Sequence, residues 1–426
     1  MLDLVVRRAN LPDGRQGMDI ACQGGRIVEV AANIDAPQST LVIDADGCLV
    51  TPPFVDSHFH LDSTLSYGRP RVNQSGTLLE GIALWKEFVD GISADDIKAR
   101  AQTLCHWAIA RGNLAIRSHV DVSNPQLVAV RALLELREEL KPYLDLQLVA
   151  FPQQGYLRNP HARAALDAAL ELGVDVVGGI PHFERSMAEG GRSVTMLCEL
   201  AAERGLPVDM HCDESDDPAS RHIETLAYET VRLGMQGRVT GSHLTSMHAM
   251  DKHDVSKILR LMQDAKLNAV ANPLINITLQ GRHDAYPKGR GMAPVKDMMA
   301  HGINVSFGHD CLMDPWYALG SHDMLEVAHM GLHVGHMTGV DEMRACFDAV
   351  TRNGARTLGL EAYGLEPGCH ADMVVLQASD SVEALRTGPP RLQVIRRGRI
   401  IASTPRSAVT LTLGAQQIEV DFATPT

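Results

Sequence analysis

Eight short apolar runs, separated by amphipathic segments, constrain the fold of this chain more than any other feature. Most of them are rich in Val, Ile and Leu and nearly continuous in hydrophobicity, as expected for strands buried on both faces. Eight alternations of strand and helix predict an α/β fold, a (β/α)8 TIM barrel with its active site at the carboxyl ends of the strands. A doubly wound open sheet is the alternative. The predicted strands are 49–60, 114–122, 145–153, 174–181, 207–213, 238–243, 268–272 and 304–310.

Helix boundary signals support the alternation. Ser93 stands where the N-cap of a helix over 94–111 is expected, and Gly112 follows as a C-terminal stop. The other helices predicted between the strands include residues 125–140, 162–172 and 193–204.

The two ends of the chain have a different texture, with short β-like runs between glycine-rich turns. This similarity predicts one small, β-sandwich-like domain built from both ends, residues 1–50 and 366–426, beside a barrel of residues 51–365. Its predicted strands are 2–7, 19–22, 26–30, 41–43, 371–376, 391–402 and 409–422.

Charge and cysteine usage exclude several classes of protein. The formal net charge of −13 is opposite to the basic surface that nucleic-acid binding needs. The eight cysteines lack CxxC spacing, so free thiols in a reducing cytoplasm are expected. Neither an export signal nor an apolar run long enough to span a membrane is apparent, and a cytoplasmic location without membrane contact is predicted.

Side chains that can bind metal or transfer protons fall at the predicted strand ends. His58 and His60 end the first strand, and the period of two along a strand places both on one face. Histidines that merely fill a core would not gather at carboxyl ends, so this convergence predicts a metal-dependent catalytic site. The other side chains of this kind are His211 after the fifth strand, His243 after the sixth and Asp310 after the eighth.

The fifth strand also supplies a carboxylate, because Glu214 follows His211 by three residues. At that spacing Glu214 can reach a water molecule in the site while His211 holds a metal, so it is the predicted general acid and base. For Asp213 we expect either a solvated side chain or a cap on the next helix.

This set of residues resembles the amidohydrolase superfamily. For its branch with one metal ion, the resemblance implies His58, His60, His211 and Asp310 as ligands and His243 as a hydrogen-bond partner of the attacking water. The branch with two metal ions uses a lysine on the fourth strand, and residues 174–184 contain none, which favours one ion. His182 in that region is a candidate supporting residue, although a structural role is favoured.

Further motifs narrow the resemblance to the bacterial cytosine deaminase family. They imply one Fe2+ or Zn2+ ion, deamination of a free pyrimidine base in salvage, Gln153 on the amide edge of the base, and Leu78 and Trp316 lining the pocket. Glu214 would move a proton from water to N3, and Asp310 would help to protonate the leaving amino group. The motifs lie at residues 73–81, 150–155, 272–282, 286–288 and 314–317.

One position departs from the family pattern. Where a second aspartate usually follows the metal aspartate, this chain has Cys311. The resemblance places this residue near C5 of the base, and a thiol there removes a carboxylate that a methyl group would have to desolvate. We therefore expect 5-methylcytosine, giving thymine, to be a good substrate beside cytosine, giving uracil. Neutral variation at a tolerant position is the alternative.

Several alternatives stay open at this stage. A hydantoinase-like cyclic-amide hydrolase, a deaminase of isoguanine, creatinine or a triazine, and a barrel with only a structural role are the competing functions. For His119 a structural hydrogen bond is expected, and His309 should point away from Asp310 by strand alternation. Segment 274–291 covers the site or contacts another subunit, and a homo-oligomer is expected.

Overall fold

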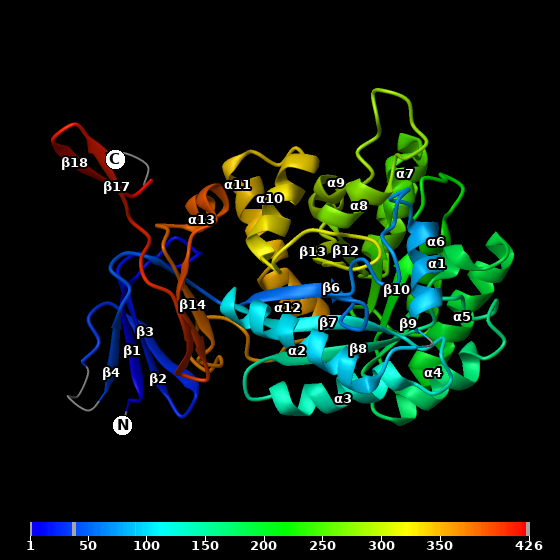
Figure 1. Cartoon of the computed structure of the whole chain (residues 1–426), viewed down its shortest axis with the longest axis horizontal. Helices are drawn as coiled ribbons and strands as arrows, with labels where there is room; N and C mark the ends of the chain where they lie inside the picture. Colours follow the sequence, from blue (N-terminus) through cyan, green and yellow to red (C-terminus); the bar gives the residue numbers. More distant parts are fainter. Residues whose placement is uncertain (1, 36–39, 90, 423–426) are drawn as a thin grey trace.

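The structure, a computed structural model, describes residues 2–35, 40–89 and 91–422. It consists of an eight-stranded barrel, on the right of Figure 1, and a smaller β domain formed from both ends of the chain, on the left. The predicted TIM barrel with a small β domain is confirmed. Its exact boundaries at residues 50 and 366 stay a prediction, and residues 36–39 and 423–426 of that domain lie outside the described residues.

The barrel strands are parallel and follow one another in sequence order around the sheet. Seven of the eight predicted strands are present within a few residues of their expected positions, and the first is divided between two sheets, as described below. A bridge between Phe59 and Asp310 closes the sheet between its first and last strands. The strands are β6 (Phe54–Phe59), β7 (Asn113–Asp121), β8 (Asp145–Phe151), β9 (Val176–Gly179), β10 (Val208–Cys212), β11 (Val239–His243), β12 (Asn268–Ala271) and β13 (Asn304–Phe307).

Helices cover the outside of the barrel (Figure 1). Ser93 caps α2 as predicted, since its Oγ accepts the backbone N–H of Asp96 at 3.1 Å. Helix α5 begins six residues before the predicted start, because Ser186 provides an earlier N-cap. The helices of the barrel are α1 (Leu78–Val89), α2 (Ala94–Ala110), α3 (Val128–Leu140), α4 (Ala162–Glu171), α5 (Met187–Arg204), α6 (His222–Arg232), α7 (Lys252–Asp264), α8 (Pro273–Leu279), α9 (Val295–Ala300), α10 (Met324–Val334), α11 (Val340–Ala349) and α12 (Arg352–Leu358), with short 3-10 turns at Pro181–Phe183 and Thr245–His248.

The small domain packs two four-stranded sheets over a shared apolar core that includes Leu4, Ile20, Val50 and Ile395. Strands from both chain ends meet in one of these sheets, which confirms the composite, sandwich-like arrangement. One sheet contains β1 (Leu4–Ala9), β2 (Met18–Gln23), β3 (Arg26–Ala31) and β4 (Leu41–Asp44), and the other β5 (Leu49–Thr51), β14 (Met373–Leu376), β15 (Arg391–Arg396) and β16 (Arg399–Ser403).

The prediction of a single strand over 49–60 is wrong. Residues Leu49–Thr51 pair with β14 in the small domain, whereas Phe54–Phe59 open the barrel. Pro52 and Pro53 lie between them, and a residue without a backbone N–H cannot continue a ladder of hydrogen bonds. The proline pair therefore separates the two sheets.

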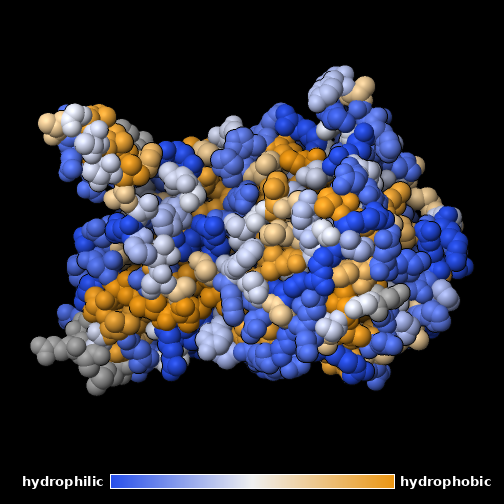
Figure 2. Space-filling model, viewed as in Figure 1, coloured by the Kyte–Doolittle hydropathy of each residue, from blue (hydrophilic) through white to orange (hydrophobic). Residues whose placement is uncertain are grey.

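The last predicted run, 409–422, does not join the sandwich. Within the described residues, strands β17 (Val409–Leu413) and β18 (Gln416–Val420) pair only with each other. They follow a short helix, α13 (Ser381–Thr387), and β16 along the chain. Figure 2 shows this hairpin standing off the body, with apolar side chains at its surface such as Leu411 and Leu413. No helix in the described part of the chain is both long and apolar enough to cross a membrane.

Candidate active site

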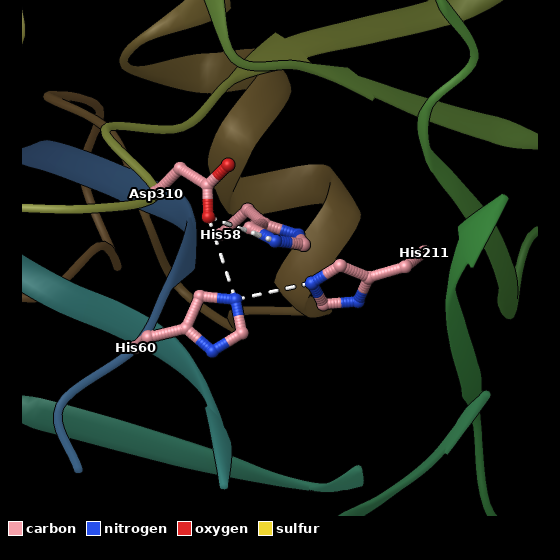
Figure 3. Close-up of side chains that lie close together, drawn as sticks. All are labelled: His58, His60, His211 and Asp310. Atoms are coloured by element: carbon pink, nitrogen blue, oxygen red, sulfur yellow. Dashed lines mark hydrogen bonds and ion pairs between the residues drawn. The ribbon is translucent and has the colours of Figure 1, made fainter. Parts of the chain in front are cut away.

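Four side chains from three strand ends converge at the carboxyl end of the barrel (Figure 3). The Nε2 atoms of His58 and His60 lie 3.5 Å and 3.4 Å from Oδ1 of Asp310. His60 Nε2 and His211 Nε2 are 3.0 Å apart. The structure thus brings together the four residues proposed as ligands, within the space that one ion would occupy.

The chemistry of this cluster fits a divalent metal ion. Both ring nitrogens of His58 and Nδ1 of His211 are buried without a hydrogen-bond partner among the described residues. Burial lowers the pKa of His58 to about 3 and that of His60 to about 4, so both rings are neutral and offer lone pairs at neutral pH. Three imidazole nitrogens and one carboxylate suit zinc or ferrous iron better than magnesium or calcium.

Two of the predicted catalytic residues occupy strained three-residue turns. His243 has a φ of 72° and Asp310 a φ of 68°. In each case the next residue donates its backbone N–H to the carbonyl of the preceding one, Leu244 to Ser242 at 3.1 Å and Cys311 to His309 at 3.0 Å. A turn of this kind with positive φ is rare and costs energy, and such strain concentrates at functional sites. The turns aim both side chains into the barrel mouth.

Glu214 is buried beside these groups. Its Oε1 lies 3.4 Å from Nδ1 of His243. Burial, and after it the charge of Asp310, raise the pKa of Glu214 well above its ordinary value. A raised pKa makes the carboxylate a stronger base and a better proton store than a solvated glutamate, which suits the predicted acid and base.

Asn272 and Asn276 lie against the ring of His243, and the sequence analysis assigned no role to either of them. Asn276 Oδ1 accepts the backbone N–H of Asn272 at 3.0 Å, so its Nδ2 faces Nδ1 of His243, also at 3.0 Å. An amide N–H can only donate, and His243 Nδ1 is therefore the acceptor, with the ring proton on Nε2. Asn272 and Asn276 are four residues apart within 272–282, a spacing that places two side chains on the same side of a helix. This spacing was the signal in the sequence, provided that a helix is expected there.

The predicted substrate residues line one pocket together with His60, His211 and Asp310. Gln153, Leu78, Cys311 and Trp316 all border it, and Trp316 Nε1 donates to the carbonyl oxygen of Leu78 at 3.3 Å. Sequence reasoning missed two apolar members, which α8 contributes, so the first part of segment 274–291 covers the site. The complete lining is His60, Leu78, Gln153, His211, Glu214, His243, Ile275, Leu279, Asp310, Cys311 and Trp316.

Cys311 belongs to an apolar wall of this pocket. It packs with Ile275 and Leu279, and Leu78 and Trp316 pack against the same cluster. Burial, together with the charges of Asp310 and other nearby carboxylates, raises the pKa of the Cys311 thiol well above its ordinary value, so the side chain is neutral. The neutral thiol donates to Oδ1 of Asp310 at 3.6 Å, and beside Ile275 and Leu279 it presents a surface on which a methyl group needs no polar partner.

The neighbouring polar residues have structural roles. Asp213 is buried rather than solvated, and its carboxylate accepts the backbone N–H groups of His222 and Ile223 at the start of α6. The hydrogen bond expected for His119 is absent, because neither ring nitrogen has a hydrogen-bond partner within residues 2–35, 40–89 and 91–422, although Nε2 lies 3.7 Å from Oδ1 of Asp209. His119 instead packs against His58, with ring centroids 4.1 Å apart. His182 likewise lacks a hydrogen bond among the residues described.

The fold and this site define a member of a large class of metal-dependent hydrolases. Residues 41–402 match the Amidohydrolase family, and the chain belongs to that family. This membership agrees with a barrel whose carboxyl end carries three histidines and an aspartate.

Within the family, the chain is similar to a solved 5-methylcytosine deaminase from Klebsiella pneumoniae, crystallised with phosphonocytosine. The two share 40% identity over 95% of this chain and 99% of that one, with a TM-score of 0.92. The N-isopropylammelide isopropyl amidohydrolase of Pseudomonas sp. (strain ADP) is 29% identical over 94% of this chain and 97% of its own length. A pterin deaminase of Rhizobium rhizogenes is 28% identical over 91% of this chain.

Proposed function

We propose that this protein hydrolytically deaminates free cytosine-type bases, converting 5-methylcytosine to thymine and cytosine to uracil with release of ammonia. The observation that carries the proposal is one pocket in which Gln153, Glu214 and the apolar wall at Cys311 lie beside His60, His211 and Asp310. Similarity along nearly the whole chain to a 5-methylcytosine deaminase supports the same choice of substrate.

One divalent ion, Fe2+ or Zn2+, would be held by His58, His60, His211 and Asp310. When bound, it lowers the pKa of water and so supplies hydroxide at neutral pH. The neutral ring of His58, neither nitrogen of which has a hydrogen bond among the described residues, supports this assignment, because a protonated ring could not act as a ligand.

The protein's own groups would then move the protons. Glu214 takes a proton from the attacking water and delivers it to N3 of the ring, which makes C4 electrophilic. His243, held by Asn276, orients the attacking oxygen toward C4. Asp310 helps to transfer the second proton to the amino group, and the bond between C4 and the amino nitrogen breaks to release ammonia.

Binding of the base would rest on one polar and one apolar contact. The amide of Gln153 is buried in the pocket and would pair with the amide edge of the pyrimidine. Cys311, with Ile275 and Leu279 behind it, would face C5.

A panel of candidate substrates tests the proposal. Ammonia release would be measured with cytosine, 5-methylcytosine, isoguanine, creatinine, a triazine and a hydantoin, for enzyme loaded with iron or with zinc. We expect the highest kcat/KM for the two cytosines. A higher value for a triazine, isoguanine or creatinine would contradict the proposed substrate class, and ring opening of the hydantoin would indicate a cyclic-amide hydrolase instead. A role in pyrimidine salvage, a cytoplasmic location and a homo-oligomer stay predictions.

A further inference from the structure

His309 lies outside the pocket, yet it is bonded twice to Cys311. Its backbone carbonyl accepts the N–H of Cys311 at 3.0 Å, and its ring Nδ1 lies 3.0 Å from the carbonyl oxygen of Cys311. The ring is fully buried and does not line the pocket. His309 therefore holds both polar groups of the Cys311 backbone from behind the site.

These two bonds stabilise the strained turn described above. Asp310 at its centre has a positive φ of 68°, a conformation that persists only when the surroundings hold it. On the other side, the backbone N–H of Asp310 donates to the carbonyl of His58 at 2.8 Å. The first strand thus anchors Asp310, whereas Cys311 depends on the ring of His309.

The ring itself has little freedom to move. It stacks on His322 with an interplanar angle of 15°, and His322 in turn pairs with Asp56 at 3.0 Å. Oδ1 of the same Asp56 accepts the backbone N–H of His309 at 3.0 Å. Gly320 lies next to the ring, where a Cβ atom would come within 2.6 Å of Cε1 of His309, so only glycine leaves room for it.

The bonding partner also determines the tautomer. A carbonyl oxygen can only accept, so the ring proton of His309 sits on Nδ1 and is donated to Cys311.

We propose that His309 is a positioning residue that sets the substrate preference at the 5-position of the pyrimidine by holding Cys311 in its strained turn. This inference rests on the proposed function, in which Cys311 faces C5. A methyl group at C5 would contact the Cys311 side chain directly, whereas a hydrogen leaves a gap. Movement of Cys311 should therefore change the reaction of 5-methylcytosine more than that of cytosine.

Two substitutions of His309 separate the hydrogen bond from the bulk of the ring. His309→Asn keeps an N–H donor near the position of Nδ1, whereas His309→Leu keeps volume and loses the donor. We expect His309→Leu to change the ratio of kcat/KM for 5-methylcytosine over cytosine by about fivefold or more, the effect of one lost hydrogen bond. His309→Asn should stay near the wild-type ratio. If His309→Leu does not fold, His309→Gln, with its amide nitrogen farther from the backbone, replaces it.

A double-mutant cycle with Cys311→Ala tests whether His309 acts through Cys311. With the thiol removed, His309→Leu should no longer change the substrate ratio. Phe347→Leu, in the core between α11 and β6, is the matched control: it should lower Tm without moving the ratio. Metal content, measured for every variant, should be unchanged.

The outcomes separate the inference from the proposed function. A ratio that is insensitive to His309, or that shifts equally in the Cys311→Ala background, overturns the positioning role while leaving the deaminase intact. A wild-type enzyme that releases no ammonia from either cytosine overturns the proposed function, and the positioning role with it. The inference is supported if His309→Leu shifts the ratio of kcat/KM for 5-methylcytosine over cytosine and His309→Asn keeps it near the wild-type value. In the Cys311→Ala background, His309→Leu should leave the ratio unchanged.

Discussion

Asn276 Nδ2 lies 3.0 Å from Nδ1 of His243, a contact that links the short helix α8 to the end of the sixth barrel strand. The backbone N–H of Asn272 occupies the amide oxygen of Asn276 and thereby determines which side of the amide faces the histidine. The helix that covers the pocket therefore also sets the tautomer of His243, the side chain proposed to orient the attacking water.

Asn276→Asp should lower kcat with little change in KM. A carboxylate cannot donate to Nδ1, so His243 would carry its proton on the wrong nitrogen or become charged. We expect a loss of about tenfold in kcat from the lost donor and the altered proton position, measured by steady-state ammonia release. Thr278→Ala on the same helix is the matched control, because its hydroxyl bonds only within the helix. Equal losses in both variants would point to a general effect on α8.

Removal of the metal should abolish activity and lower stability together. An ion that binds only the folded chain stabilises it by about 2.7 kcal/mol at a concentration one hundred times its Kd. Chelated enzyme should therefore melt at a lower temperature and recover both Tm and activity when Fe2+ or Zn2+ is restored. His211→Ala should lose the ion and this response, whereas His161→Ala, at an exposed position, should keep about one ion per chain. Metal retained by His211→Ala would contradict the assigned ligand set.

Glu214→Gln separates proton transfer from metal binding. The amide has nearly the same shape but cannot take up and deliver a proton, so kcat should fall by about 10² to 10⁴. Metal content should remain that of the wild type, because Glu214 is outside the ligand cluster. Glu203→Gln, on the surface of α5, provides the control for loss of a glutamate. Activity within a fewfold of the wild type would remove Glu214 from the reaction.

The strand ends of the barrel were predictable because their signals are local. An apolar run that stops at a histidine or an aspartate marks both a strand and its carboxyl end, and parallel strands bring such ends together. For this reason His58, His211 and Asp310 meet as expected. The contribution of α8 was not visible, because a helix of seven residues carries little periodic signal and its Asn276 reaches a strand 33 residues away.

The ends of the chain were harder to interpret. Alternation predicts a strand but not the sheet that receives it, so Leu49–Thr51 and Phe54–Phe59 were merged although they belong to different sheets. The hairpin β17 and β18 was predicted as strand, yet its detachment from the sandwich depends on tertiary contacts that a sequence pattern does not contain.

Asp314 should make stability depend on pH. Burial raises its pKa to about 7, so the folded state holds a proton that the unfolded chain releases near pH 4. The preference of the folded state for protonated Asp314 contributes fully to the free energy of unfolding below about pH 4, and this contribution is lost as the pH rises through 7. Asp314→Asn keeps an oxygen for the backbone N–H groups of Trp316 and Tyr317, each 2.9 Å away, and removes the titration. The Tm of Asp314→Asn minus the Tm of the wild type should therefore be larger at pH 8 than at pH 5. The same difference at both pH values would contradict this prediction.

Cys311→Asp should shift the preference from 5-methylcytosine toward cytosine. The methyl group would then face a carboxylate instead of the apolar wall formed with Ile275 and Leu279. Loss of a buried methyl contact accounts for only about 0.8 kcal/mol. Desolvation of the carboxylate adds to this cost, and together the two effects should lower kcat/KM for 5-methylcytosine by at least about tenfold. Cytosine, which lacks the methyl group, should change much less. Cys346→Ala, a buried thiol far from the pocket, is the control and should leave both substrates unaffected. If the ratio of the two kcat/KM values is the same in Cys311→Asp and the wild type, the thiol does not determine specificity, and Ile275 and Leu279 become the next positions to substitute.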